Sequence, residues 1–256
     1  MKRFIVFLKQ VPASTKVEMD PVTKRLKRNS ALTQVNPDDL YALQLALTLK
    51  RRMPAEIVAV SMGPSSAEDV LREALQRGAD KAILLSSRAF AGSDTLCTSR
   101  VLAEAVKKIG SYSLLLFGRM AIDGDTAQVG PEVAGFLNIP QITQLVSVNE
   151  INDAKIRIQR KGDHTIQLLE VDLPCAVMVG KENCDLDYLT LSGWRRAMKQ
   201  KIEHWNEEDL HLSSDEVGLE ASPTHVVKTE VPENKKKIIW ITQAKDLICQ
   251  IQRSKK

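Results

Sequence analysis

The sequence lacks most features that mark specialised protein classes. Its 256 residues contain no apolar run close to the roughly 20 residues that a membrane-crossing helix requires, so we expect no membrane insertion. Glycine and proline number 12 and 10, too few for a collagen-like or low-complexity chain. A chain of this length buries enough surface to fold without disulfide or metal cross-links. These absences leave an ordinary globular protein.

Cysteine and histidine are also sparse and scattered. The four cysteines form no Cys-x-x-Cys pair and no cluster with histidine; they are Cys97, Cys175, Cys184 and Cys249. Free thiols are typical of a reducing compartment, so we expect a cytoplasmic protein. The four histidines are separated along the chain as well. We therefore expect no metal site and no catalytic side chain of this chain's own.

The basic excess is small and local. Lysine and arginine outnumber aspartate and glutamate by 36 − 32 = 4, and much of the excess lies in Lys24–Arg28, Lys235–Lys237 and Lys255–Lys256. Only five Phe, three Trp and three Tyr are available for stacking on bases, and no nucleic-acid-binding motif accompanies the basic runs. We interpret these runs as solvated faces and expect no nucleic-acid partner.

What is present is an alternation of strand-like and helix-like segments. Four apolar runs predict buried strands, at Arg3–Leu8, Glu56–Ser61, Lys81–Ser86 and Tyr112–Gly118. Stretches of helical length separate them, which implies right-handed crossovers and a mainly parallel sheet. The sequence therefore predicts a doubly wound, Rossmann-like α/β fold with a mainly parallel sheet.

The clearest helix start is at Asn36. This residue suits the N-cap, Pro37 suits the first helical position, and Asp38 and Asp39 suit the positive helix end. A second, shorter helix is predicted from Asp125 or Thr126 to Leu137.

The second half of the chain changes character. Thr143–Asn149, Lys155–Arg160 and Thr165–Val171 predict a small antiparallel extension, followed by a short strand at Ala176–Gly180. From Asp185 onward we expect no regular strand. From the residues we expect an α/β domain over 1–184, and an extended C-terminal arm within 185–256 that lies across this domain or a partner.

The most informative segment is Gly118–Pro131, which follows a buried strand and precedes a helix. Nucleotides bind at such positions in doubly wound sheets. Gly124 permits close backbone approach, and Thr126 offers a hydroxyl and an N–H to phosphate. Asp123 or Asp125 suits ribose hydroxyls, but either residue also suits a simple helix cap. A nucleotide site and an acidic capped turn therefore both remain open.

Three other segments are expected at the same edge of the sheet. Lys9–Pro12 follows the first strand, Asn36-Pro37 opens the first helix, and Met62–Pro64 ends the second strand. Because the carboxyl ends of parallel strands share one edge, these segments and the 118–131 segment should form one crevice. This convergence favours the nucleotide site.

Motifs in this order and spacing resemble the beta subunit of electron transfer flavoprotein. They are Lys9–Pro12, Asn36–Asp39, Ser61–Pro64, Gly78–Asp80, Gly118–Pro131, Leu173-Pro174, Tyr188–Leu191 and Ser222-Pro223. The resemblance implies a heterodimer with an alpha subunit that carries an FAD. It also implies that a flavin carries the redox chemistry, while the protein supplies position and electrostatics.

The 123–131 segment further resembles the electron-bifurcating branch of this family. There the beta subunit holds a second FAD that takes electrons from NADH and passes them to ferredoxin and, through the alpha-subunit FAD, to a dehydrogenase. One alternative is the non-bifurcating type, which binds a structural AMP and exchanges electrons with an acyl-CoA-type dehydrogenase. A second alternative is an adenine-nucleotide-binding sensor of similar fold.

The resemblance and the crevice together nominate the cofactor-binding residues. They are Phe7, Lys9, Asn36, Asp39, Met62, Asp123, Gly124, Asp125, Thr126, Gln128, Val129, Gly130 and Pro131. Gly124 and Gly130 are expected to leave room for a pyrophosphate. Phe7 either packs on the adenine or is a core aromatic.

The segment Cys184–Met198 resembles the loop with which this family docks on dehydrogenases. Leu191 would be the apolar anchor, with Tyr188 and Trp194 beside it. Exposed leucine and tryptophan among polar residues fit a partner hot spot. The alternative is that these side chains pack on the alpha subunit. The resemblance thus implies a nucleotide-binding domain over 1–184, and a recognition loop with a C-terminal arm, packed on the partner subunit, over 185–256.

Overall fold

The computed structural model describes residues 2–13, 32–181, 184–227, 240–241 and 243–253. The chain forms two compact units, Met1–His225 and Val226–Lys256, which are described separately. The basic runs at 24–28, 235–237 and 255–256 lie outside the described residues.

The first unit is built on a nine-stranded sheet with the order β11-β5-β4-β1-β6-β10-β7-β8-β9. Its strands are β1 (Lys2–Phe7), β4 (Ala55–Met62), β5 (Lys81–Leu85), β6 (Leu114–Gly118), β7 (Gln141–Ile151), β8 (Lys155–Lys161), β9 (Ile166–Asp172), β10 (Cys175–Val179) and β11 (Ile202–Trp205). Only the pairs β7–β8 and β8–β9 are antiparallel. A separate two-stranded ribbon joins β2 (Gln10–Pro12) to β3 (Thr33–Val35).

The strand order places a topological switch point between β1 and β6. From β1 the chain moves outward through β4 to β5, and then returns to pair β6 with the other side of β1. The crossover helices therefore lie on opposite faces, and the loops after β1 and β6 diverge. Ligands in open α/β sheets bind at such a point, outside the carboxyl ends of the strands.

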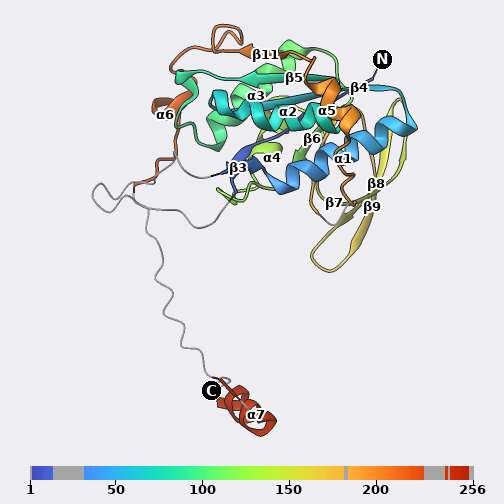
Figure 1. Ribbon diagram of the computed structural model, residues 1–256, viewed down its shortest axis with the longest axis vertical. Helices are drawn as coiled ribbons and strands as arrows, with labels where there is room; N and C mark the ends of the chain where they lie inside the picture. Colours follow the sequence, from blue (N-terminus) through green and yellow to red (C-terminus); the bar gives the residue numbers. More distant parts are fainter. Residues whose placement is uncertain (1, 14–31, 182–183, 228–239, 242, 254–256) are drawn as a thin grey trace. The chain divides into compact units, whose positions relative to one another are not determined.

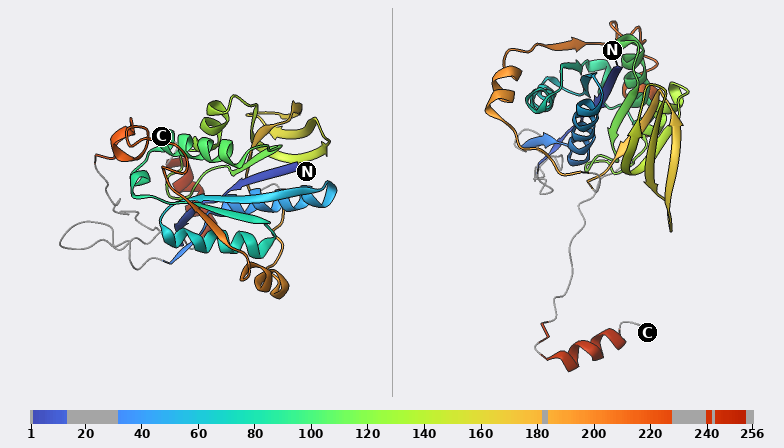
Figure 2. Two further views of the ribbon diagram at one scale, coloured as in Figure 1. Left: turned by 90° about the horizontal axis from the view of Figure 1, so that it is seen from above. Right: turned by 90° about the vertical axis from the view of Figure 1, so that its right-hand side faces the viewer.

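Helices cover both faces of the sheet (Figures 1 and 2). One face carries α1 (Pro37–Arg52), α2 (Glu68–Arg77) and α5 (Leu191–Ala197), and the other carries α3 (Thr95–Ile109) and α4 (Val129–Phe136). The first unit also contains three short helices: η1 (Ser65–Ala67), η2 (Arg88–Phe90) and α6 (Gly218–Ala221). Each face has its own buried cluster, because alternate strand residues point to opposite sides.

The doubly wound, mainly parallel sheet with an antiparallel extension is confirmed. Two local expectations are wrong. The helix after β6 begins at Val129 rather than at residue 125 or 126, because Asp125 and Ala127 adopt left-handed backbone conformations with φ of 49° and 54°. A strand also forms after Asp185, since β11 pairs in parallel with β5.

The compact unit extends to His225, beyond the division expected at residue 184. Leu210, Leu212 and Val217 are buried in the cluster that α3 and α4 form on the sheet. Residues 185–225 therefore contribute to the core of the first unit.

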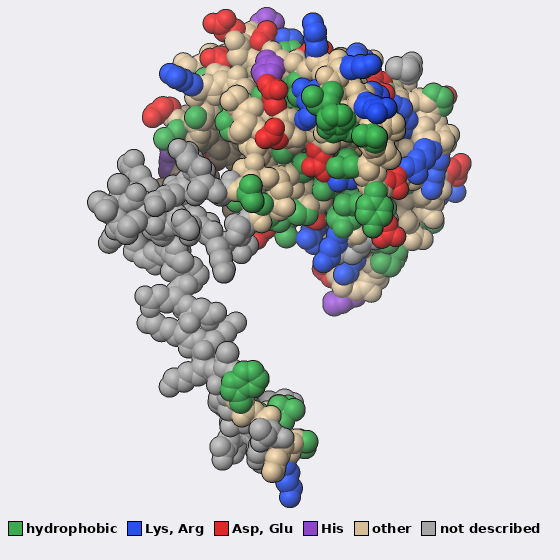
Figure 3. Space-filling model, in the orientation of Figure 1, with side chains coloured by type: hydrophobic (Ala, Val, Ile, Leu, Met, Phe, Trp, Pro, Cys, Tyr) green, Lys and Arg blue, Asp and Glu red, His purple; other side chains and the backbone are tan. Residues whose placement is uncertain are grey.

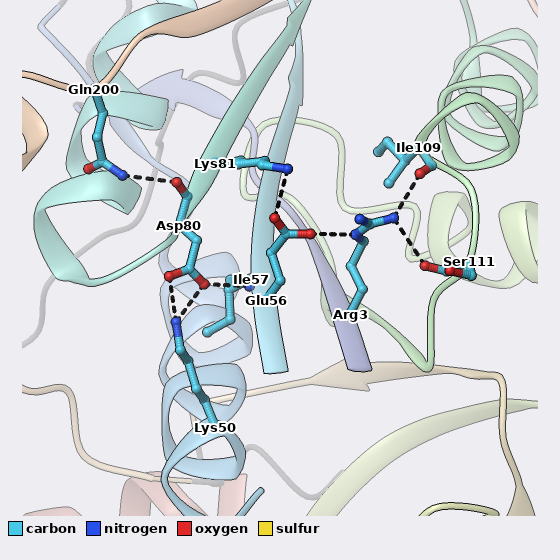
Figure 4. A network of polar contacts seen from close by, with 9 residues as sticks. All are labelled: Arg3, Lys50, Glu56, Ile57, Asp80, Lys81, Ile109, Ser111 and Gln200. Carbon is cyan, nitrogen blue, oxygen red and sulfur yellow. Dashed lines mark hydrogen bonds and ion pairs between the residues drawn. The ribbon is translucent and has the colours of Figure 1, made fainter. Parts of the chain in front are cut away.

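A network of charged side chains closes the amino edge of the sheet (Figure 4). Glu56 accepts one hydrogen bond from Arg3 Nε at 2.7 Å and forms an ion pair with Lys81 at 2.7 Å. Nearby, Asp80 pairs with Lys50 and accepts from the backbone N–H of Ile57. The hydrogen bond from Lys81, and then that from Arg3, hold the pKa of Glu56 below its ordinary value although burial acts in the opposite sense. The charges at this edge are thus neutralised within the chain.

In the second unit the described structure is the helix α7 (Ala244–Arg253). Leu247, Ile248 and Ile251 are about half exposed. No helix in the described part of the chain is long and apolar enough to cross a membrane.

Candidate functional site

A cleft of about 1050 Å³ lies at the carboxyl edge of the sheet, over the ends of β1, β4, β5 and β6. It therefore includes the switch point between β1 and β6. Its lining comes from the loops that follow these four strands and from the first turns of α3 and α4. A volume of this size is at the upper end of the range for small-molecule sites.

Asn36 and Asp39 join three of these loops. The Asn36 side chain donates to Asp39 Oδ1 at 2.9 Å and to the carbonyl of Met120 at 3.0 Å, and it accepts from the N–H of Ile122 at 3.1 Å. Asp39 Oδ2 accepts from the backbone N–H of Lys9 at 2.7 Å. Asn36 occupies the N-cap position of α1, but its side chain makes no capping bond, because its polar atoms hold the loop after β6.

Asp39 is a buried carboxyl group at the floor of the cleft. Burial raises its pKa to about 7, against hydrogen bonds from Asn36 and from the backbone N–H groups of Lys9 and Gly118, which lower it. No described cation forms an ion pair with it at 4.0 Å or less. The cleft thus contains a carboxyl group that holds its proton to a higher pH than an ordinary aspartate does.

Gly118 permits the close approach of α1 to the end of β6. A Cβ atom at this position would lie 2.1 Å from Asp39 Oδ1 and 2.8 Å from the backbone nitrogen of Asp39. Any side chain would therefore displace the start of α1. The glycine at the end of this strand is a condition for the Asn36–Asp39 arrangement.

The loop from Asp123 to Gln128 offers unpaired backbone donors. No acceptor in the described part of the chain takes the N–H of Thr126, Ala127 or Gln128, and the first N–H groups of α4 are free by helix geometry. Left-handed residues on both sides of Thr126 curl this backbone, a conformation typical of anion-binding loops. The segment is suited to a phosphate group.

Gly124 lies in this loop and Gly130 lies in the first turn of α4, and the two glycines serve different purposes. A Cβ atom on Gly124 would meet no heavy atom within 4 Å, so this residue faces open space. A Cβ atom on Gly130 would lie 2.8 Å from Met178 Cε, so this glycine allows α4 to pack closely on the sheet. Of the two, Gly124 leaves room for a ligand.

Phe7 belongs to the core and also lines the cleft. Its ring stacks on that of Phe117, with centroids 4.2 Å apart and planes inclined by 6°. Both side chains are almost fully buried, and both contribute to the cleft surface. The pair forms an apolar floor at the switch point, between the ends of β1 and β6.

The side of the cleft opposite the 123–128 loop is formed by residues that the sequence did not nominate for cofactor binding. We call Ser86–Thr95, which connects β5 to α3, the β5–α3 wall; most of its residues line the cleft. It is held from outside by residues 218–224: Ser222 Oγ accepts from the N–H of Asp94, and Ser93 Oγ accepts from the N–H of Gly218. The sequence of the wall, with three serines and one glycine, matches no binding motif.

The two helix starts in the cleft are capped differently. Asp94 caps α3 by accepting from the N–H of Cys97. Although burial acts to raise it, the pKa of Asp94 lies below its ordinary value because the N–H groups of Cys97 and Thr224 stabilise the carboxylate. At α4 the N-cap residue is Gln128, with no capping side chain, and Glu132 lies in the first turn. The N–H groups at the start of α4 are therefore available to a ligand, whereas the cap carboxylate occupies the start of α3.

Most of the nominated cofactor-binding residues line this cleft. They are Phe7, Lys9, Asp39, Met62, Gly124, Asp125, Thr126, Gln128, Val129 and Gly130. The other three lie beside it. Asn36 is buried and positions the loops, Asp123 pairs with Lys9 at 2.8 Å, and Pro131 is the third residue of α4.

The nominated docking residues are exposed on the face of α1, α2 and α5. Tyr188, Leu191 and Trp194 are 96%, 65% and 49% exposed. The segment is held at its start by Asp187, whose carboxylate contacts both Gln44 and Arg51 of α1. A Cβ atom on Gly193 would lie 2.2 Å from the carbonyl oxygen of Gln76, so α5 sits directly on α2.

The arrangement can bind and orient a nucleotide. The described residues contain no group of three or more His, Cys, Asp or Glu side chains that could hold a metal ion. Unpaired N–H groups, an apolar floor and an open Gly124 suit a phosphate joined to an aromatic base or ring. A flavin or adenine nucleotide therefore fits the residues that form the cleft.

Comparison with known proteins identifies the family. A family model described as the electron transfer flavoprotein domain matches residues 23–210. The caffeyl-CoA reductase-Etf complex subunit CarD of Acetobacterium woodii is 42% identical over 91% of this chain and 89% of its own length. The electron transfer flavoprotein subunit beta of Clostridium acetobutylicum is 40% identical over 90% and 88%. Protein FixA of Bradyrhizobium diazoefficiens is 40% identical over 89% and 82%. The chain belongs to the electron transfer flavoprotein family, among its beta subunits.

Proposed function

We propose that this chain binds FAD in the carboxyl-edge cleft and forms a cytoplasmic heterodimer with an alpha subunit that carries a second FAD. The heterodimer takes electrons from NADH and divides them between ferredoxin and a flavin-dependent dehydrogenase of the acyl-CoA type or a related type. The observation that carries the proposal is the extent of the cleft, which continues from the 123–130 loop to the β5–α3 wall.

The strand order gives the distance between the two sides of this cleft. Going from β6 to β5 takes three steps across the sheet, through β1 and β4. At about 4.8 Å a step the two sides are about 14 Å apart. A mononucleotide with its phosphate at α4 engages one side only, whereas a dinucleotide spans both. The volume and the two lined sides thus favour FAD over AMP.

The chain's own residues bind and position the cofactor. The free N–H groups of Thr126, Ala127 and Gln128 and the start of α4 hold phosphate, while Asn36 and Asp39 fix the loops around it. Apolar side chains at the floor exclude water from the ring system. The flavin supplies the electron transfer itself.

The exposed segment around α5 is proposed as the surface for the dehydrogenase. Leu191 and Trp194 are accompanied by exposed Leu189 and Met198. Figure 3 shows hydrophobic side chains next to lysine and arginine side chains over the α1, α2 and α5 region. Exposed apolar groups of this size among charged residues are typical of an interaction site. Docking through Leu191 remains part of the proposal.

The nucleotide content of the purified heterodimer tests the proposal. Acid release followed by chromatography should give two FAD and no AMP for each heterodimer, and NADH should bleach flavin absorbance under anaerobic conditions. One FAD and one AMP would contradict it and identify a non-bifurcating beta subunit. A beta chain that retains its nucleotide and remains stable without an alpha subunit would instead indicate a sensor.

A further inference from the structure

The segment from Tyr188 to Lys201, which includes α5, carries positive charge only. It contains four cations and no aspartate or glutamate; the cations are Arg195, Arg196, Lys199 and Lys201. All four residues are exposed. The positive charge of this one segment thus equals the net charge of the whole chain, +4.

Three of these cations are available to a partner. Arg196 donates to the carbonyl of Leu75 at 3.2 Å and belongs to the contact between α5 and α2. Arg195, Lys199 and Lys201 form no ion pair and no side-chain hydrogen bond with any described residue. Their charges are therefore not used by the fold.

Carboxylates of the adjoining elements do not neutralise this charge. Asp187 is bound by Arg51 of α1, and Glu73 of α2 pairs with Arg77 at 2.7 Å. Two exposed carboxylates also lie farther than 4.0 Å from the three cations: Asp69 and Asp185. The surface over α5 thus keeps its positive charge.

This surface is held in place at both ends of α5. Thr190 caps the helix by accepting from the N–H of Gly193 at 3.0 Å. At the other end Arg72 of α2 donates to the carbonyl oxygens of Ala197 and Gln200, at 2.6 and 2.8 Å. Because the helix is fixed before any partner binds, less conformational entropy is lost on binding.

Exposed apolar side chains lie among these cations. We call the two groups together the α5 surface, with apolar Tyr188, Leu189, Leu191, Trp194 and Met198 and basic Arg195, Lys199 and Lys201. Figure 3 shows hydrophobic side chains next to lysine and arginine side chains over this region. Protein interfaces commonly have an apolar centre within a polar rim. Because like charges that face one another oppose binding, a rim of one sign requires the opposite sign on the partner.

We propose that the α5 surface binds an acidic face of the partner dehydrogenase, on which carboxylates surround an apolar pocket for Leu191 and Trp194. This inference rests on the proposed function, which assigns the dehydrogenase to this surface. The cations attract the partner at a distance and set the association rate, whereas the apolar side chains lose water on contact and set the lifetime of the complex. The two groups of residues therefore have separately measurable effects.

The test is the rate of flavin reduction in the dehydrogenase by the NADH-reduced heterodimer with ferredoxin present, followed by stopped-flow absorbance. The probe is the flavin-dependent dehydrogenase that exchanges electrons with the wild-type heterodimer, isolated from the same cells by that activity. Lys199→Glu should lower the second-order rate constant about fivefold at about 10 mM ionic strength, where charges act over about 30 Å. At about 1 M, where they act over about 3 Å, the loss should be less than about 1.5-fold.

Two further variants and a control separate charge from apolar contact. Lys199→Gln removes one charge instead of reversing it, and should lower the low-salt rate constant about twofold. Lys161→Glu is the matched control, because it reverses an exposed, unpaired charge on β8, at the other end of the sheet from β11; it should leave the rate constant unchanged. Leu191→Ala should raise the dissociation rate about tenfold and keep the salt dependence of association.

Four results would overturn the inference. One is a wild-type rate constant for Lys199→Glu at low salt, and another is a loss that persists at high salt. Separation of the subunits in Lys199→Glu would place the residue at the alpha-subunit interface instead. Slower reduction of ferredoxin, with an unchanged rate for the dehydrogenase, would assign the surface to ferredoxin.

Failure of this inference is distinguishable from failure of the proposed function. A wild-type heterodimer that exchanges electrons with no flavin-dependent dehydrogenase contradicts the proposed function before any variant is made. A wild-type heterodimer that does exchange electrons, at a rate insensitive to Lys199→Glu, contradicts the acidic docking face alone.

Discussion

Two buried carboxyl groups at opposite edges of the sheet have opposite surroundings. At the amino edge Glu56 lies between Arg3 and Lys81, and its pKa is lowered. At the carboxyl edge Asp39 is surrounded by neutral donors, and burial raises its pKa to about 7. One edge is neutralised within the chain, whereas the other leaves donors and space for a ligand. The amino edge thus contributes to the stability of the fold, and the carboxyl edge is the one available for ligand binding.

The largest expected effect comes from closing the carboxyl edge with one methyl group. Gly118→Ala places a Cβ atom 2.1 Å from Asp39 Oδ1, which has to move together with the start of α1. We expect a loss of about 3 kcal/mol in the free energy of unfolding, at the high end for overpacking, and loss of bound nucleotide. Urea denaturation and nucleotide release measure both.

Gly124→Ala is the matched control for this substitution. Its new Cβ atom meets no heavy atom within 4 Å, so the free energy of unfolding should change by less than about 0.5 kcal/mol. Equal stability of the two alanine variants would contradict the account of Gly118.

Removing the charge at the amino edge should affect stability and not binding. Glu56→Gln weakens the hydrogen bonds from Arg3 and Lys81 and should cost about 2 kcal/mol. Because the folded pKa of Glu56 is lowered, its contribution is present above an unfolded pKa near 4.5 and is lost as the pH falls through the folded value. Urea denaturation from pH 3 to pH 8 measures this.

The exposed Glu203 on β11 provides a comparison for Glu56, since Glu203→Gln should leave stability unchanged. Loss of nucleotide from the folded Glu56→Gln heterodimer would show that the two edges are not independent.

The raised pKa of Asp39 predicts that stability depends on pH with a sign opposite to that expected for Glu56. The folded protein binds a proton here more tightly than the unfolded chain, whose pKa is near 3.8. The free energy of unfolding should therefore fall as the pH rises from about 4 to about 7, by up to about 1.4 kcal/mol per pH unit from this group. Asp39→Asn should remove that slope. Parallel pH profiles of the wild type and the variant would contradict a raised pKa.

The smallest effect is expected at the half-exposed pair of Lys50 and Asp80. Lys50→Ala should cost less than about 1 kcal/mol, because solvent and salt screen such a pair. Asp80→Ala should cost more, since Asp80 also accepts from the N–H of Ile57. If Lys50→Ala were as damaging as Glu56→Gln, burial would not distinguish the two ion pairs.

The sequence predicted those elements whose local signals agree with the fold. Strands β1, β4, β5 and β6 are continuous apolar runs, and Pro37 with two aspartates marks the start of α1. Strand β11 was missed because Ile202–Trp205 is short and half polar, and it forms only where β5 offers an open edge. The formation of β11 therefore depends on its pairing with β5 rather than on its own sequence.

For the candidate site, the sequence predicted the side that carries glycine and aspartate motifs and missed the opposite side. The 123–130 loop stands out through Gly124 and its neighbours, whereas the β5–α3 wall is positioned by Gly218 and Ser222, more than a hundred residues away. The contact of Asn36 with Ile122 is equally non-local. Such contacts cannot be derived from spacing in one sequence.

A structure of the nucleotide-loaded heterodimer tests the central claim most directly. The account predicts density for a dinucleotide, with its phosphates at the N–H groups of Thr126–Gly130 and the rest of the molecule extending to the β5–α3 wall. Density for a mononucleotide confined to the β6–α4 side, with only water along the β5–α3 wall, would contradict it.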